Sequence, residues 1–105
     1  PTKTAVKFKI SITSPEPNQA IRENTGSVYV STQIAPRFEA GFTIGLFLNG
    51  VAIGEPSDTT TLALRDVERG QHTLQVKLYN QQNQVIATSP ESIFFMHRKG
   101  LNIGR

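Results

Sequence analysis

The sequence contains no cysteine and no tryptophan, and it has no long hydrophobic run. The absence of cysteine excludes a disulfide framework, thiolate zinc sites and thiol nucleophiles. No apolar stretch approaches the roughly 20 residues that a membrane-spanning helix requires. A charged segment followed by an apolar one, the pattern of a signal peptide, is also missing from the sequence as given. The sequence therefore predicts a chain without a transmembrane segment and leaves its redox compartment open.

The length of 105 residues and the composition predict one folded domain. Chains of this size bury enough surface for one core and too little for two. Hydrophobic residues make up 37% of the chain and charged residues 18%, which separates it from disordered proteins. We expect a single domain over residues 1–105, with an ordered core at about residues 5–98. Because the sequence starts at Pro1 without an initiator methionine, we expect it to be excised from a longer chain.

The formal net charge of +3 comes from basic residues near the two ends. Residues 10–97 hold five of the eleven basic side chains and all eight acidic ones. A protein that binds nucleic acid usually concentrates lysine and arginine on one face of its folded body. The sequence shows no such concentration, so we expect solvated termini and no nucleic-acid partner.

Apolar residues recur with a period of two, which places alternate side chains on opposite faces of a strand. The pattern begins with Val6, Phe8, Ile10 and Ile12, which alternate with polar residues. Another clear instance alternates Leu74, Val76 and Leu78 with Thr73, Gln75 and Lys77. The sequence predicts strands at residues 6–12, 28–34, 42–48, 51–53, 59–64, 71–79 and 85–96.

Turn residues separate these strands. Asn49-Gly50 predicts a tight type I′ hairpin, because both residue types tolerate positive φ. The polar run at residues 80–83 predicts a second hairpin. Ser89-Pro90 interrupts the last strand, since proline has no backbone N–H for a strand ladder. Ile21 lies between turn signals, and we expect it to be a lone anchor that holds a loop against the core.

The fold predicted from these patterns is all-β. No segment repeats apolar residues at helical spacing for three turns, so we expect essentially no α-helix. Seven or so short strands at nearly regular spacing are typical of an immunoglobulin-like two-sheet antiparallel sandwich. A barrel is the alternative, but an oligonucleotide-binding barrel has five longer strands and a helix.

Five segments resemble immunoglobulin-like (fibronectin-III-like) modules of the bacterial envelope. They are residues 12–15 with 21–24, residues 48–50 with 53–54, and residues 67–76. The chain is similar in particular to the C-terminal sandwich of bifunctional penicillin-binding proteins and to small exported proteins of unknown function. The family often has a tryptophan in the third strand, and residues 42–48 have none. The resemblance implies an extracytoplasmic accessory domain and carries over no catalytic residue.

Residues that could support chemistry are isolated in the sequence. His72 and His97 have no carboxylate or cysteine at ligand spacing, whereas zinc needs three or four converging ligands. Acidic residues form two pairs, at positions 55 and 58 and at positions 66 and 68. The strand predicted at 59–64 would hold these pairs apart, and neither alone supplies the oxygen ligands of calcium. We expect no catalytic, cofactor-binding or metal-binding residue, and no enzyme activity.

Aromatic residues on the polar phase of their strands are the candidates for a binding surface. Phe47 and Tyr79 are two of them, and one of Phe94 and Phe95 must also face outward if that strand alternates. The third, sixth and seventh strands share a sheet in this architecture. We expect a candidate partner surface made of Phe47, Tyr79 and Phe94, unless these are unconnected surface aromatics or a neighbouring domain covers them.

Two functions from different classes remain after these exclusions. The first is a non-catalytic accessory or protein-interaction module of a bacterial envelope protein, in the periplasm or cell envelope. Its partner would be a companion domain or another envelope protein. The alternative is a module that binds carbohydrate or glycan strands through the outward aromatic residues, which the absence of tryptophan disfavours.

Overall fold

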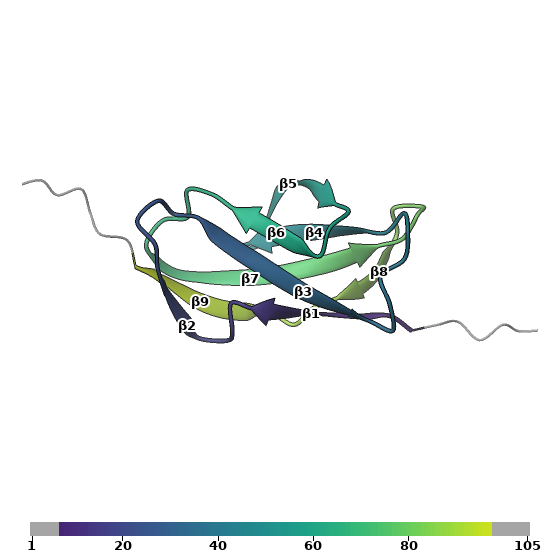
Figure 1. The fold of residues 1–105 in the computed structure, drawn as a ribbon, viewed down its shortest axis with the longest axis horizontal. Coiled ribbons are helices and arrows are strands. Elements are labelled where there is room, and N and C mark those ends of the chain that lie inside the picture. Colours follow the sequence, from purple (N-terminus) through teal and green to yellow (C-terminus); the bar gives the residue numbers. More distant parts are fainter. Residues whose placement is uncertain (1–6, 98–105) are drawn as a thin grey trace, which may run out of the picture.

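The computed structural model describes residues 7–97, which form nine strands and no helix (Figure 1). The strands are β1 (Lys9–Ser14), β2 (Gln19–Arg22), β3 (Val28–Ala35), β4 (Thr43–Leu48), β5 (Val51–Ser57), β6 (Thr61–Leu64), β7 (Gly70–Tyr79), β8 (Val85–Thr88) and β9 (Ser92–His97). No helix that could cross a membrane is found among these residues. Val6 lies outside the described residues, as do four of the terminal basic residues, Lys3, Arg98, Lys99 and Arg105; the other two, Lys7 and Lys9, lie within them.

Two sheets pack face to face as an immunoglobulin-like sandwich, which confirms the predicted fold class. The smaller sheet has the order β1-β3-β6, and the larger one has the order β2-β9-β7-β4-β5, with β8 paired to the far half of β7. All pairings are antiparallel except β2 with β9. The described chain enters at one end of the sandwich and leaves at the other (Figure 1).

The strand β2 is the main difference from the sequence-based expectation. Ile21 was predicted to anchor a loop, but it lies in β2, where it pairs with Met96 of β9 in parallel. Ile21 does pack against the core as expected. A four-residue strand is too short to show a period of two, and Pro15 and Pro17 just before it indicate a loop. With β2 added and the last predicted strand divided into β8 and β9, the seven expected strands become nine.

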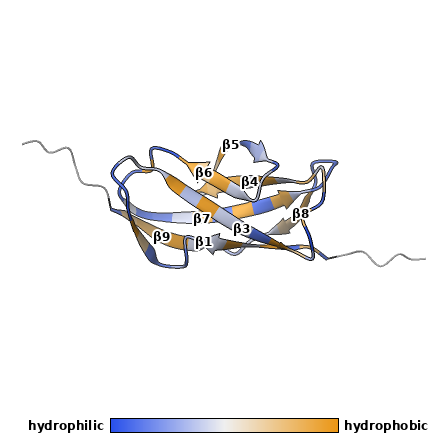
Figure 2. Cartoon of the chain, in the orientation of Figure 1, coloured by the Kyte–Doolittle hydropathy of each residue, from blue (hydrophilic) through white to orange (hydrophobic). Residues whose placement is uncertain are grey.

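The core lies between the two sheets and follows the predicted alternation. On β7 the inward residues Leu74, Val76 and Leu78 are completely buried. The smaller sheet contributes Val28 and Val30 from β3 and Leu62 and Leu64 from β6. Hydrophobic and more polar residues alternate along β3 in Figure 2. Burial of these side chains drives the packing of the sheets, at about 1.5–3 kcal/mol for each large side chain.

The last strand breaks at the predicted position. Ser89 is buried there, between β8 and β9. Its hydroxyl oxygen accepts a hydrogen bond from the backbone N–H of Val76 at 3.0 Å and donates to the carbonyl of Pro90 at 2.9 Å. The backbone N–H of Ser89 donates to the carbonyl of Val76 at 2.9 Å. Ser89 thus bonds both backbone groups of Val76 at the point where β7 changes its partner from β9 to β8.

Candidate functional site

Phe47 faces outward from the larger sheet, as the sequence predicts. It pairs with Gln75 of β7 on one side and with Ala52 of β5 on the other. The ring is partly exposed, and the ammonium group of Lys77 lies 4.8 Å from its centroid. This cation–π contact covers part of the ring with a positive charge and fixes the lysine above the sheet.

Tyr79 also faces outward, and its ring lies across Gly45 of the neighbouring strand β4. A Cβ atom at position 45 would stand 2.8 Å from Cε2 of Tyr79 and 3.1 Å from its hydroxyl oxygen. A side chain at this position would therefore displace the ring. Glycine inside a strand is otherwise unfavourable, and a close approach by another group is one of the reasons for it. Gly45 makes room for a tyrosine that lies against the backbone of β4.

The ring of Tyr79 lies at Gly45, two residues from Phe47 on the same face of β4, and two further residues extend this outer face on either side. Val85 of β8 pairs with Tyr79 and is 50% exposed. Ala52 extends the surface beyond Phe47 onto β5. We call Val85, Tyr79, Phe47 and Ala52 the apolar stripe; it crosses β8, β7, β4 and β5 on the outer face of the larger sheet. The sequence analysis missed both residues. Ala52 lies on the outward phase of β5, whereas Val85 faces outward because the register between β7 and β8 shifts after Leu78.

Phe94 does not belong to this surface, so that part of the prediction is wrong. It is 1% exposed and lies between the two sheets, where its ring stacks on His72 with centroids 5.5 Å apart. Phe94 pairs with His72 on the inward phase of β7, whereas Phe95 pairs with the outward residue Gln71. Phe95 is the outward aromatic, but Gln71 is eight residues along β7 from Tyr79, or about 26 Å. Phe95 therefore lies apart from the apolar stripe.

Both histidines were expected to have no role in chemistry. His72 is held by two hydrogen bonds: its Nδ1 accepts from the side-chain amide of Asn49 at 3.0 Å, and its Nε2 donates to the carbonyl of Glu68 at 2.6 Å. Both ring nitrogens are thus occupied by contacts that join the β4–β5 turn to β7. His97 is exposed at the end of β9.

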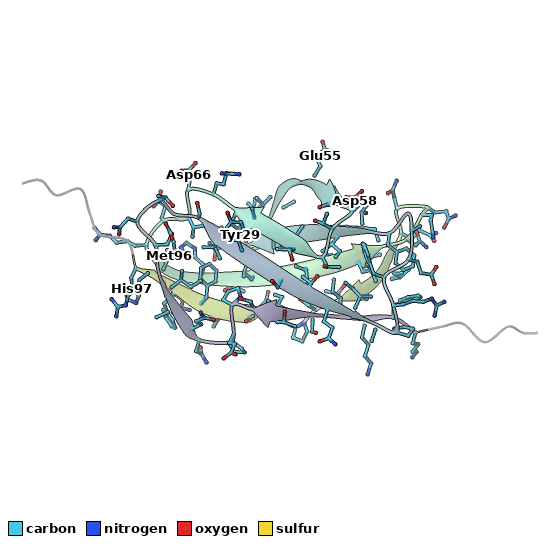
Figure 3. The ribbon with its side chains drawn as sticks, viewed as in Figure 1. Tyr29, Glu55, Asp58, Asp66, Met96 and His97 are labelled. Carbon is cyan, nitrogen blue, oxygen red and sulfur yellow. The ribbon has the colours of Figure 1, made fainter. Side chains whose placement is uncertain are left out.

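The acidic pairs lie at different ends of β6, as predicted. Asp58 comes before this strand and Asp66 after it, and Figure 3 shows the two well separated. Among residues 7–97, no three histidine, aspartate or glutamate side chains are grouped so that they could hold a metal ion.

A pocket of about 270 Å³ lies between β5 and β6, where the two sheets end on the same side of the sandwich. Its lining includes Leu46 and Leu62 from the facing sheets and Ile53 and Glu55 from β5. The sequence did not reveal this pocket. The pocket forms because residues 54–57 bend away from β6. The sequence pattern indicates where strands lie but not how far apart β5 and β6 are.

Comparisons with known proteins identify relatives in structure alone. Neither a protein-family model nor a curated protein matches the sequence. The fibronectin(III)-like modules of Clostridium thermocellum CbhA match at a TM-score of 0.64 and 14% identity, over 87% of this chain and 99% of theirs.

Two longer bacterial proteins also match. A Corynebacterium diphtheriae protein described as membrane-anchored has a TM-score of 0.65 at 14% identity, over 90% of this chain and 22% of its own. SGBP-B of the Bacteroides ovatus mixed-linkage glucan utilization locus, solved with a mixed-linkage heptasaccharide, has a TM-score of 0.57 at 14% identity, over 87% of this chain and 24% of its own. At these identities the matches show the fold: the chain is an immunoglobulin-like sandwich similar to fibronectin-III-like modules.

Proposed function

We propose that this chain is a non-catalytic accessory module of a bacterial envelope protein, and that it contacts a companion domain or protein through the apolar stripe. The observation that carries this proposal is that the four side chains of the stripe lie on the same outer face of one sheet, one on each of four strands. Large apolar side chains on the outer face of a sheet gain little for an isolated domain. A surface of this kind is typical of a protein contact.

Other features support the same role. The buried Ser89 and the partly buried His72 make hydrogen bonds that connect strands and turns. The likeness to fibronectin(III)-like modules, and to a protein described as membrane-anchored, fits an accessory domain outside the cytoplasm. The relation to penicillin-binding proteins, implied by the sequence resemblance, has no support among the structural matches and is not part of the proposal.

Photo-cross-linking tests the proposed contact. In the natural protein, produced in its own host, Phe47 is replaced by a benzophenone amino acid, and Tyr29 is replaced in a matched control. Tyr29 is 67% exposed and lies on β3, in the smaller sheet. We expect a covalent product at position 47, to a companion domain or a second envelope protein, that is absent at position 29. Equal labelling at both positions, or none at 47, would contradict the proposal.

Carbohydrate binding is the second candidate, and the geometry of Tyr79 favours it. The ring lies against β4 because Gly45 has no side chain, and aromatic rings held along a sheet offer a face on which sugar rings can stack. Phe47 is less suited, because Lys77 lies over its ring. One structural match was solved with a bound heptasaccharide.

Affinity electrophoresis in gels containing mixed-linkage glucan, xylan or solubilised peptidoglycan tests this second function. We expect retardation of the wild-type chain in one of these gels, loss of retardation in Tyr79→Ala, and unchanged retardation in the control Tyr29→Ala. The ring removed is partly exposed and outside the core, so the variant should stay folded. Unretarded migration of the wild type in all three gels, or retardation that survives Tyr79→Ala, would refute carbohydrate binding at the stripe.

A further inference from the structure

The pocket between β5 and β6 opens beside the edge strand of the smaller sheet. Leu46 and Leu62, from facing sheets, contribute to its apolar lining, and Ile53 of β5 is still 36% exposed. Val51, at the start of β5, is 62% exposed. Figure 1 shows β5 curving away from β6. The two sheets thus leave part of their inner, apolar surface open on this side.

The backbone of β6 is available for pairing along this opening. Only β3 pairs with β6 in the described part of the chain. The N–H of Thr32 donates to the carbonyl of Thr60 at 3.0 Å, and the antiparallel register then directs the backbone groups of Leu62 and Leu64 toward β3. The backbone groups of Thr61 and Ala63 must point the other way, toward the open edge. The carbonyl of Thr61 accepts a hydrogen bond from the hydroxyl of Thr59 at 2.9 Å there, so an added strand would pair chiefly with the N–H of Thr61 and both backbone groups of Ala63. A strand added there would place alternate side chains in the pocket.

The edge of β5, on the other side of the pocket, is less suited to pairing. Its register with β4 shifts between Ile44 and Leu46, Gly54 has a positive φ of 67°, and Pro56 has no N–H to donate. Bulges and prolines are common means of protecting an edge strand. β6 has neither feature in Thr61–Leu64, so it is the edge that can accept another strand.

The charge around the pocket selects a basic partner. Residues 50–64 contain Glu55 and Asp58 and no lysine or arginine; Arg65 follows the end of β6. Glu55 lines the pocket, and Figure 3 shows its side chain and that of Asp58 on β5 and on the β5–β6 turn. Opposite charges favour encounter and fix the register of a partner.

We propose that β6 binds residues 98–105 of a second copy of this chain as an added antiparallel strand. This segment has the sequence RKGLNIGR, with three basic residues and no acidic one. Leu101 and Ile103 are two residues apart, so in a strand both would point into the pocket. With Ile103 opposite Leu62, the antiparallel register places Leu101 opposite Leu64 and Arg105 opposite Thr60, close to Asp58.

Distance favours a second copy over the same one. Residues 98–103 span at most about 22 Å when fully extended. The chain leaves β9 at the end where Met96 pairs with Gly70, whereas Ile53 is level with Val76. From Met96 to Ile53 the path covers six residues along β7 and three strand spacings across the sheet, from β9 to β5. Taken at right angles, these two components give a straight-line distance of about 25 Å through the protein. Because that line runs through the folded domain, the segment of the same copy would need a longer path around it to bring Ile103 to the pocket.

Titration of a fluorescent peptide with the sequence of residues 98–105 into the folded chain tests the pairing. The receiving chain carries Leu101→Asp/Ile103→Asp so that its own segment does not compete. We expect saturable binding, weakened about tenfold or more, which is about 1.4 kcal/mol, by Ile53→Asp. Ala63→Pro should have a similar effect, because it removes an N–H that faces the open edge and leaves the pairs with β3 intact. Ala20→Asp, at an exposed position of β2 on the opposite edge of the larger sheet from β5, is the matched control and should bind as before.

Sedimentation equilibrium of the full chain tests whether the segment acts between copies. We expect association that increases with concentration and is lost in Leu101→Asp/Ile103→Asp and in Ala63→Pro. A monomer at all concentrations, association unchanged by these substitutions, or a peptide that binds Ala63→Pro as well as the parent chain would overturn the proposal. Circular dichroism and thermal midpoints establish that each variant is folded. The pocket is separate from the apolar stripe, so failure here leaves the proposed function standing.

Discussion

Phe94→Ala should lower the free energy of unfolding by about 3–5 kcal/mol, the range for removing a large aromatic side chain from a packed core. Phe94 is 1% exposed and ranks among the largest fully buried side chains. The substitution also removes the ring on which His72 stacks. Much of the stability of a domain of this size would be lost, since such domains have only about 5–15 kcal/mol in total.

The matched control is Phe95→Ala, one residue further along β9. Phe95 faces outward opposite Gln71 and is partly exposed, so we expect a loss of about 1 kcal/mol or less. Urea unfolding followed by circular dichroism measures both variants, with the slope of the transition compared to detect changes in the denatured state. If Phe95→Ala proved the more destabilising of the two, β9 would have the opposite register from the one described.

Phe94 and Phe95 also show which features of the fold could be predicted from the sequence and which could not. Period-two alternation located most strands, because each placed polar residues between its apolar ones. Residues 93–96 are all apolar, so alternation gives no phase there. The phase comes from the pairing of β9 with β7, which connects residues about twenty positions apart. The sequence predicted a strand at the right place and the wrong phenylalanine for its outer face.

The candidate surface could be predicted from the sequence only in strands where polar and apolar residues alternate clearly. Phe47 and Tyr79 were assigned outward from their own strands, and both face outward. The contact between Tyr79 and Gly45 joins β7 to β4 and has no counterpart in the spacing of either strand. The pocket beside β6 likewise depends on the bend of β5, which tertiary packing determines. The alternation within each strand thus predicted which side chains point outward. Which of these side chains lie next to one another is determined by the pairing of the strands and was seen only in the structure.

The turn between β4 and β5 shows a local signal with a wider structural role. Asn49 and Gly50 have φ values of 54° and 84°, and Leu48 pairs with Val51 across the two-residue loop, which confirms the predicted type I′ hairpin. Beyond the turn, the Asn49 side-chain oxygen accepts a hydrogen bond from the N–H of Thr73 at 3.0 Å, and its amide donates to His72. One side chain therefore connects the hairpin to β7.

We expect Asn49→Ala to cost about 2–3 kcal/mol, from about 1–2 kcal/mol for left-handed backbone in alanine and the rest from the two lost hydrogen bonds. Asn49→Gly is the control that separates these causes, because glycine accepts the positive φ without strain and loses only the hydrogen bonds. Its expected cost is about 1 kcal/mol, a decrease of about 4–8 °C in the thermal midpoint. Thermal unfolding of the three proteins measures the difference. Equal midpoints for the alanine and glycine variants would mean that backbone strain at position 49 contributes nothing and that the hydrogen bonds to His72 and Thr73 account for the whole effect.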